Sequence, residues 1–335
     1  MRPRLLYSVC AVFVLFAVLL TVSCGKPPAQ RSSGEDVNGR IVKDAYGKAV
    51  RIPRKPERIL TLSIYTDEIA LGLVTTDKLV AISRFHDDPK ESVIVEKARK
   101  IPEKMDGVPT AEQIVAWRPD VVFATPWTSP EEIAVIEDLK IPVIVCGPSD
   151  SYGDIQANIR MMAAGLWETE RGEKLIAAMD EVKREIDAKV AQIPESERKS
   201  VALVSVMPTY GGEGSTFDDM CKHAGVINGV AAIGLQNGQI LTKELLVKVN
   251  PDILVLPNYD DKGTFDTKQF ISGYVDDPAL QSMKAIQEQA FFYPREGYIY
   301  NGSQDFVFGI QEIAFGAYGE AFRQEDNRHL SFSGE

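Results

Sequence analysis

The 335-residue chain is poor in the residue types from which catalytic and metal sites are usually built. It has only three histidines, His86, His223 and His329, and no two of them have the four-residue spacing of a helical metal site. No Cys-x-x-Cys pair, Gly-x-Ser-x-Gly nucleophile turn or Gly-x-x-x-x-Gly-Lys-Ser/Thr phosphate loop occurs. We therefore predict no protein-ligated metal, no intrinsic cofactor and no enzymatic activity.

Two local features leave alternatives open. His86 follows a predicted strand, where it either reaches a ligand or is a solvated loop histidine. The glycine-rich stretch Gly211–Ser215 precedes a predicted helix, a place where anions bind. However, Glu213 carries the wrong charge for an anion site, so a structural turn is the favoured interpretation.

The chain also lacks clusters of positive charge. It contains 37 Lys and Arg against 48 Asp and Glu, for a net charge of −11. This balance argues against a nucleic-acid partner. With 44% hydrophobic and 25% charged residues the composition is that of a globular protein, and the length suits two domains.

The N-terminus carries an export signal. Arg2 and Arg4 precede an apolar stretch, Leu5–Val22, and small residues lead to Cys24. The position of Cys24 resembles a bacterial lipobox, although Thr21 stands where that motif more often has Leu. Lipidation of Cys24 is expected, and an uncleaved membrane span is the alternative. Either reading places the protein outside the cytoplasm, anchored at the outer face of the cytoplasmic membrane or in the periplasm.

One supersecondary template is used twice. Glu112 begins a short apolar helix that stops at Pro119-Asp120 and leads into Val121–Ala124, and Glu244 begins the second copy. In that copy the helix stops at Pro251-Asp252 before the apolar run Ile253–Leu256. Proline disfavours a helical residue before it, and an apolar run without alternation is typical of a buried parallel strand. The repeat predicts two similar α/β lobes with a ligand cleft between them.

The predicted fold class is therefore α/β, with two Rossmann-like lobes that contain central parallel sheets. A single long α-helix within a helical segment joins them, and this stiff link should let the lobes move little. The predicted parts are a signal peptide at 1–24, a tether at 25–39, an N-terminal lobe at 40–153, the link at 154–193 and a C-terminal lobe at 194–335.

Shorter elements are predicted within these parts. They are a hairpin at 40–52, strands at 58–64, 79–83, 121–124, 141–146 and 200–206, and helices at 66–73, 110–117, 130–140, 155–166, 170–192 and 303–322, with Thr66 and Thr169 as caps.

Outside the signal, the chain has only two cysteines. Cys146 and Cys221 fall in different predicted lobes, so a disulfide between them would lock the cleft. We expect two unpaired, buried thiols, and the disulfide is the alternative for an exported protein.

Aromatic and basic residues recur where predicted strands end. In open parallel sheets, ligands bind at that edge, and such rings suit a large planar or apolar ligand while arginines suit its anionic groups. Met207 and Tyr300 belong to this set. The predicted ligand-binding residues are Tyr65, Arg84, Phe85, Trp127, Tyr210, Tyr259, Arg295 and Tyr298.

Three stretches carry a resemblance to a known family. Val50–Leu62, Glu112–Val122 and Gly214–Asn228 resemble the corresponding segments of substrate-binding proteins of ABC importers for iron siderophores and vitamin B12 (class III). The likeness spans about Arg40 to Phe322 and implies two α/β lobes joined by one long helix.

The resemblance also implies roles for single residues. A glutamate on each lobe of such proteins docks onto arginines of the permease, and Glu112 and Glu244 match these by position. The helix dipole favours an acid in a first helical turn, which agrees with this role. Cobalamin-binding members flank the cleft with tryptophans. Here Phe85 matches an aromatic position, but Thr125 stands where one ring is expected, with Trp127 two residues later.

The sequence thus predicts a monomeric, lipid-anchored substrate-binding protein that captures a ferric siderophore. It would deliver this chelate to an ABC permease and its ATPase subunits. The alternatives are a haem- or cobalamin (corrinoid)-binding protein of the same class, or a secreted two-lobed α/β enzyme. The export signal argues against the enzyme, because comparable two-lobed enzymes need cytoplasmic reductants or nucleotides.

Overall fold

Two parallel sheets, one in each half of the chain, confirm the predicted α/β fold with two lobes. The computed structural model describes residues 39–258 and 265–334, all of which belong to one compact unit. The N-terminal sheet has the order β3-β6-β7, and its strands are Ile59–Thr61, Val121–Ala124 and Val143–Val145. The C-terminal sheet has the order β11-β10-β8-β9, with β8 at Ser200–Leu203, β9 at Ile227–Asn228, β10 at Ile253–Val255 and β11 at Phe291–Phe292.

Four short strands complete the N-terminal lobe. The predicted hairpin is formed by β1 (Arg40–Lys43) and β2 (Ala49–Ile52), which pair antiparallel. The predicted strand at 79–83 is shorter than expected, since only Ile82–Ser83 (β4) is extended, and it pairs with β5 (Lys104–Met105).

The helices of this lobe are α1 (Ile64–Leu73), α2 (Val95–Ala98), α3 (Ala111–Trp117) and α4 (Pro130–Asp138). Helix α1 begins earlier than predicted and is capped by Ser63 instead of Thr66. The Ser63 hydroxyl accepts from the Thr66 amide while the Thr66 hydroxyl accepts from the Ser63 amide. This capping box starts the helix close to the end of β3.

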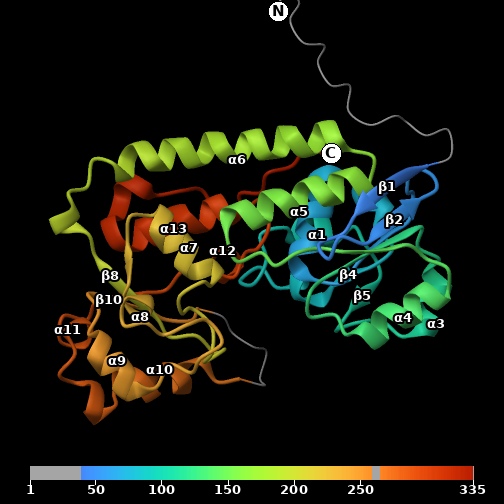
Figure 1. Ribbon diagram of the computed structural model, residues 1–335. Helices are drawn as coiled ribbons and strands as arrows, with labels where there is room; N and C mark the ends of the chain where they lie inside the picture. The colour runs from blue at the N-terminus through green and yellow to red at the C-terminus, as the bar shows by residue number, and fades with distance from the viewer. Residues whose placement is uncertain (1–38, 259–264, 335) are drawn as a thin grey trace, which may run out of the picture. The chain divides into compact units, whose positions relative to one another are not determined.

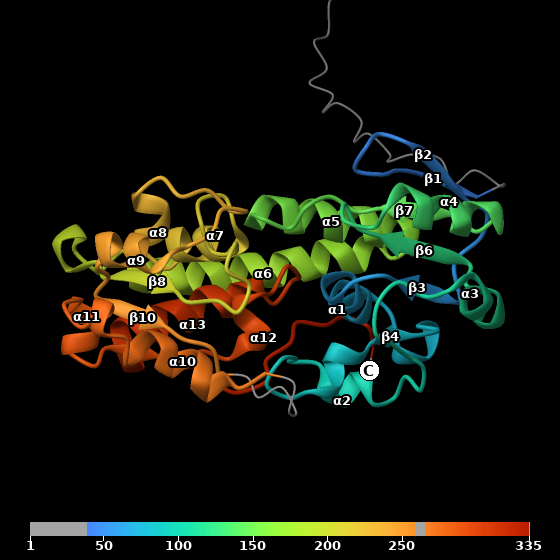
Figure 2. The same ribbon diagram turned by 90° about the horizontal axis from the view of Figure 1, so that it is seen from below.

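The predicted helical link consists of α5 (Tyr152–Gly165) and α6 (Thr169–Val190) (Figure 1). Helix α6 contacts α5 and α1 on the N-terminal side and α13 on the C-terminal side (Figure 2). At Gly172 a side chain is excluded, because an added Cβ would lie 2.6 Å from the Ala163 Cβ of α5. The predicted cap Thr169 is instead the first helical residue, after Glu168.

The C-terminal lobe contains the remaining described helices. They are α7 (Thr216–His223), α8 (Gly229–Ala232), α9 (Lys243–Val249), α10 (Thr267–Val275), α11 (Lys284–Gln287), α12 (Glu296–Ile299) and α13 (Phe306–Tyr318), followed by the 3-10 turn η5 (Gly319–Phe322).

The repeated template folds alike in both lobes. Thr110 caps α3 and Thr242 caps α9, each accepting a hydrogen bond from the third helical residue. Both helices end on a left-handed residue before the proline, Arg118 with φ 47° and Asn250 with φ 43°. The sequence similarity therefore extends to the backbone conformation at both helix ends.

The Pro-Asp aspartate of each template binds the start of the first strand in the parallel sheet of its lobe, which is β3 in one lobe and β8 in the other. The Asp120 carboxylate accepts from the amide groups of Glu57 and Arg58, at 2.9 and 3.1 Å. The Asp252 carboxylate accepts from the amide and hydroxyl of Ser200, at 2.8 and 2.9 Å. The Pro-Asp pair thus ends a helix and sets the position of a strand.

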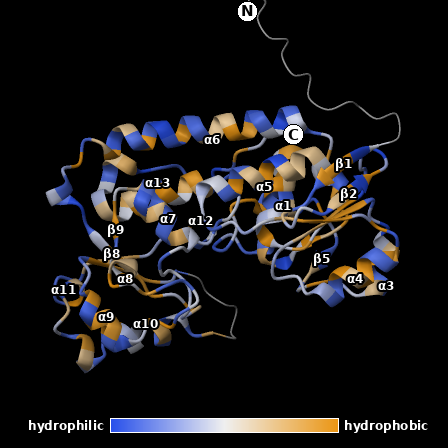
Figure 3. Ribbon diagram, in the orientation of Figure 1, coloured by the Kyte–Doolittle hydropathy of each residue, from blue (hydrophilic) through white to orange (hydrophobic). Residues whose placement is uncertain are grey.

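One apolar core runs through both lobes. Ile69 of α1, Leu175 of α6, Phe217 of α7 and Phe308 of α13 are all buried in a single cluster. Figure 3 shows that α6 alternates apolar and polar residues along its length, as expected for a helix that covers this core on one side. In the described part of the chain, no helix combines the length and apolar character needed to cross a membrane.

Buried hydrogen bonds also join the lobes. Asn301 donates to the Glu68 carboxylate at 2.8 Å, and Gln304 donates to the Glu68 carbonyl at 2.8 Å. Near the C-terminus, Phe332 donates its amide to the Gly72 carbonyl at 2.8 Å. The last described residues therefore contact the predicted N-terminal lobe, while the predicted domain boundaries themselves stay a prediction.

Candidate functional site

A cleft of about 700 Å³ lies where the two lobes meet. Most of its lining follows the carboxyl ends of β3, β4, β6, β7 and β8, the edge at which the sequence predicts a ligand. The lining residues are Leu62, Ser63, Ile64, Tyr65, Ser83, Phe85, Met105, Asp106, Gly107, Val108, Trp127, Ser149, Asp150, Met207, Tyr210, Thr216, Asn237, Tyr300 and Gly302.

Five aromatic rings from both lobes line this cleft. Phe85 and Trp127 are 55% and 64% exposed, so their faces are available to a ligand. Trp127 meets Tyr65 edge to face, with ring centroids 5.6 Å apart. On the opposite lobe, the Tyr210 and Tyr300 rings are 5.0 Å apart. The rings thus form two groups that face the cleft from different lobes.

Hydrogen bonds fix three of these rings. The Tyr65 hydroxyl donates to the Gly147 carbonyl at 3.0 Å, and the Tyr210 hydroxyl donates to the Ile299 carbonyl at 3.3 Å. The Tyr300 hydroxyl is 2.9 Å from the Ser205 hydroxyl. Burial raises the pKa of both Tyr65 and Tyr210, which keeps these phenols neutral. The cleft therefore presents positioned, uncharged rings.

The cleft carries acids but no cation among its described lining residues. Asp106 is engaged by Arg84, whose Nε lies 2.6 Å from the carboxylate. Asp150 makes no such pair with a cation in the described part of the chain, and burial, followed by the charge of Asp154, raises its pKa. The Asp150 side chain is exposed in the cleft, so a positive group placed there would be attracted by this carboxylate.

Four of the eight predicted ligand residues line the cleft: Tyr65, Phe85, Trp127 and Tyr210. Arg84 stands beside it, paired with Asp106. Tyr259 lies outside the described residues, as does the predicted lipidation site Cys24.

The structure does not bring Arg295 and Tyr298 to the cleft. Tyr298 is fully buried, and its hydroxyl donates to the Arg328 carbonyl at 3.0 Å. Arg295 pairs with Glu312 and Asp326. Both residues follow the last strand in sequence, but their side chains bind partners between Glu312 and Arg328 instead of lining the cleft.

Sequence reasoning missed several lining residues. Ser149 and Asp150 follow β7, and only their place after a strand marks them. Thr216 begins α7, after the glycine-rich turn, and donates to the Ser149 carbonyl across the cleft at 3.0 Å. Gly302 lies close to Ser149 and Tyr65, which leaves no space for a side chain there.

The glycine-rich turn has a structural role. Gly211 and Gly214 have φ angles of +102° and +79°, which other residues rarely adopt. Ser215 then caps α7 by accepting from the Asp218 amide at 3.1 Å. The turn thus positions Thr216 at the cleft.

His86 is neither solvated nor exposed to the cleft. It is fully buried, with Nδ1 2.8 Å from the Ser92 hydroxyl and Nε2 3.2 Å from Asp67. The expectation of two unpaired, buried thiols is confirmed for Cys146 and Cys221. Burial raises the pKa of both thiols, so they are poor nucleophiles.

The predicted docking acids lie on the surface of equivalent helices. Glu112 and Glu244 are exposed in the first turns of α3 and α9. A hydrogen bond with its own backbone amide and one with Thr242 lower the pKa of Glu244. It is therefore ionised at neutral pH.

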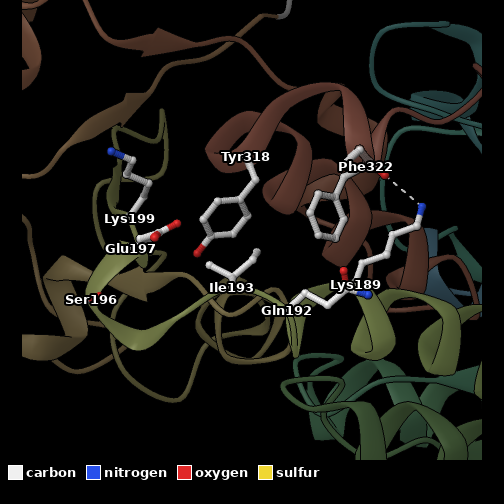
Figure 4. A pocket seen from close by; sticks show the side chains of 9 residues that line it. Lys189, Gln192, Ile193, Ser196, Glu197, Lys199, Tyr318 and Phe322 are labelled. Carbon is white, nitrogen blue, oxygen red and sulfur yellow. Dashed lines mark hydrogen bonds between the residues drawn. The ribbon is translucent and has the colours of Figure 1, made fainter.

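A second hollow, of about 660 Å³, lies where α6 ends against η5 (Figure 4). The Tyr318 and Phe322 rings line it together with Lys189, whose ammonium donates to the Ala321 carbonyl at 2.9 Å. None of its lining residues comes from the N-terminal sheet or its loops. The cleft between the lobes is therefore the better candidate for the ligand site.

Comparison with known proteins agrees with this architecture. The family model described as periplasmic binding protein matches residues 59–296. The chain is 24% identical over 322 residues to the uncharacterized ABC transporter substrate-binding lipoprotein YvrC of Bacillus subtilis, covering 93% of this chain and 97% of that protein.

Two solved structures show the same fold. The molybdate-bound protein MolA of Haemophilus influenzae superposes with a TM-score of 0.69 at 19% identity, covering 83% of this chain and 91% of that chain. The haem-binding protein RhuT of Roseiflexus gives a TM-score of 0.66 at 22% identity, covering 80% and 99%. Since the family model spans most of the chain, this protein belongs to the periplasmic binding protein family: it is an exported substrate-binding protein of an ABC importer, not an enzyme.

Proposed function

We propose that the protein captures a ferric siderophore that is uncharged or cationic, such as a ferric trihydroxamate, and delivers it to an ABC permease. The observation that carries this proposal is the cleft, which combines five aromatic rings with acids and no cation among its described lining residues. In a ferric trihydroxamate the hydroxamate anions balance the ferric charge and the ligand backbone is largely apolar. Such a surface suits exposed aromatic faces.

The names of the relatives do not decide the ligand, because they include a molybdate binder and a haem binder. Molybdate is a small anion and haem carries propionates, and both would be opposed by Asp150 in this cleft. A corrinoid is the second candidate, since it is large and has no carboxylates that require arginine, and Trp127 offers an exposed ring.

The experiment is a calorimetric titration of residues 25–335 with a matched set of probes. The set contains a ferric trihydroxamate with a free ammonium group, its N-acetylated neutral form, a ferric tris-catecholate, haem and cyanocobalamin. We expect the two hydroxamates to bind, the cationic one more tightly, and the tris-catecholate and haem to bind weakly. Tight binding of the anionic chelates alone would contradict the proposal, and tight binding of cyanocobalamin alone would select the corrinoid.

Asp150→Asn is the matched variant for the charge argument. It should lower the affinity for the ammonium-bearing chelate several-fold and leave the affinity for the N-acetylated form unchanged, because only the ammonium group is attracted by a carboxylate. Equal losses of affinity for both chelates would show that Asp150 supports the structure of the cleft and does not act through its charge.

We further propose that Cys24 carries the lipid anchor and that Glu112 and Glu244 dock the protein onto arginines of the permease. Their support is the equivalent, exposed position of the two acids in both lobes. The double variant Glu112→Ala/Glu244→Ala should keep chelate affinity and lose uptake by cells. Loss of affinity would show instead that the acids act on the cleft.

A further inference from the structure

The two template helices share an exposed valine as well as an acid. In α3, Ile114 is buried and Val115 is 55% exposed. In α9, the equivalent Leu246 is buried and Val247 is 36% exposed. Both helices therefore have a buried apolar residue followed by an exposed valine. A charged side chain at the valine position would not disturb the packing of the core.

Each valine lies on the same helix face as the acid. Val115 follows Glu112 by one helical turn, and Val247 stands in the same relation to Glu244. Residues three apart in a helix are surface neighbours. Both lobes thus present an adjoining carboxylate and branched apolar side chain.

An acid alone makes a weak contact. Exposed ion pairs contribute little to association and lose most of that contribution as salt is added. An apolar side chain covered by a partner adds a contribution that salt does not screen. Single exposed valines are ordinary on protein surfaces, but these two occupy equivalent positions of a duplicated unit.

The surface beside Val115 has room for a partner side chain. Val115 borders a hollow of about 520 Å³ whose apolar lining includes Ile114, Leu139 and Ile141. Arg54 and Arg118 stand at the same hollow, and Arg54 donates to Asp120 at 2.8 Å. An apolar side chain of the partner would therefore find both a contact and space on this lobe.

We propose that Val115 and Val247, with Glu112 and Glu244, form a paired contact surface for the ABC permease, in which a basic residue and an apolar residue of the permease meet each helix. This inference rests on the proposed docking role of the two acids.

The test measures uptake and chelate affinity in parallel. In the source bacterium, the gene is exchanged for a gene that encodes one of three variants. These variants are Val115→Asp/Val247→Asp, Glu112→Gln/Glu244→Gln and Val135→Asp. Val135 is the matched control, since it is 46% exposed on α4 and lies outside the template. Uptake is followed with the radiolabelled ferric trihydroxamate, ferric tris-catecholate, haem and cyanocobalamin, and the affinity is measured on the purified variants.

We expect the valine variant to lose roughly tenfold or more of its uptake while its chelate affinity stays within about twofold of wild type. The Val135→Asp control should transport normally. Loss of uptake in the acid variant together with normal uptake in the valine variant would overturn the inference and leave docking by the acids intact.

The other outcomes are also decisive. Normal uptake in both double variants would show that neither the acids nor the valines contribute to docking. Absence of uptake and of binding for every probe in the wild type would refute the proposed function, and the present inference with it. Loss of uptake in the control as strong as in the valine variant would show an unspecific effect of a surface charge and would contradict the inference.

Discussion

Trp127 is the residue on which ligand capture should depend most. Its ring is 64% exposed at the mouth of the cleft and is braced by the edge of Tyr65. We expect Trp127→Ala to lower the affinity for the bound chelate by roughly 10- to 100-fold, because a positioned aromatic face is lost. Calorimetry measures the change, with Tyr46→Ala as the control for an exposed ring outside the cleft. An unchanged affinity in Trp127→Ala would show that this ring does not contribute to ligand binding.

We expect Glu68 to make the free energy of unfolding depend on pH. It is buried at the lobe junction, surrounded by His86, Asn301, Asp305 and His329, and burial raises its pKa to about 7. A carboxyl group with a raised folded-state pKa contributes most to stability below its unfolded pKa and loses that contribution as pH rises through about 7. The free energy of unfolding should therefore fall between about pH 5 and pH 7.5.

The variant Glu68→Gln isolates this effect. It keeps an oxygen for the bond from Asn301 but does not ionise, so stability should vary less with pH, by on the order of 2 kcal/mol over the same interval. Part of the slope should remain, because burial also raises the pKa of Glu296 to about 7. Denaturant unfolding at a series of pH values measures the slope. Identical slopes in the variant and the wild type would contradict the role of Glu68.

At the residue scale, the direction in which a side chain points after a strand could not be predicted from the sequence. Tyr65, Phe85, Trp127 and Tyr210 were predictable at the cleft, because each follows a buried strand. Tyr298 also follows a strand, but it packs edge to face on Phe308 in the core. Which way a ring turns after a strand is decided by packing, and the local sequence does not contain that information.

At the scale of elements, we expect the Pro-Asp aspartates of the template to contribute to stability. Although burial opposes its charge, the bonds from Lys284 and Ser200 lower the pKa of Asp252 to about 2. A depressed carboxyl pKa stabilises the fold above the unfolded value of 3.8 and loses this effect as pH falls through about 2.

We therefore expect Asp252→Asn to lower the free energy of unfolding by about 2 kcal/mol at pH 7. The difference from wild type should shrink as the pH approaches 2. Thermal unfolding at both pH values provides the measurement, and Asp120→Asn is the equivalent change in the other lobe. A loss of stability that is the same at both pH values would point to packing instead of charge.

The template was readable from sequence because its signals are local. Threonine caps, a proline stop and a continuous apolar run each act within a few residues, and α3, α9, β6 and β10 lie where they predict. The strands at 58–64 and 79–83 were predicted too long. The capping box of Ser63 and Thr66 starts α1 soon after the first strand, and the second is extended only at Ile82–Ser83, where it pairs with β5.

At the scale of the whole molecule, we expect the two lobes to move little against each other when a ligand binds. They share one apolar cluster, α6 packs on helices of both, and buried bonds such as Asn301 to Glu68 cross between them. Spin labels at Val135→Cys and Ile240→Cys, both exposed sites, should report a change of less than about 2 Å when a chelate binds. A larger closing motion would show that the lobes are hinged.

Two lobes and an intervening cleft were predictable from a repeat, and the helical link from the spacing of its apolar residues, whereas the buried polar junction was not predictable. Glu68, Asn301 and Asp305 come together from opposite ends of the chain, and nothing in their local sequence marks them as buried. The return of Phe332 to Gly72 is equally non-local.

The most direct test of ligand capture between the lobes is an anomalous difference map at the iron edge, from crystals grown with the ferric trihydroxamate. We expect a single strong peak in the cleft, flanked by Trp127 on one lobe and Tyr210 on the other. A peak in the hollow at the end of α6, or no peak in the cleft of crystals grown with saturating chelate, would contradict it.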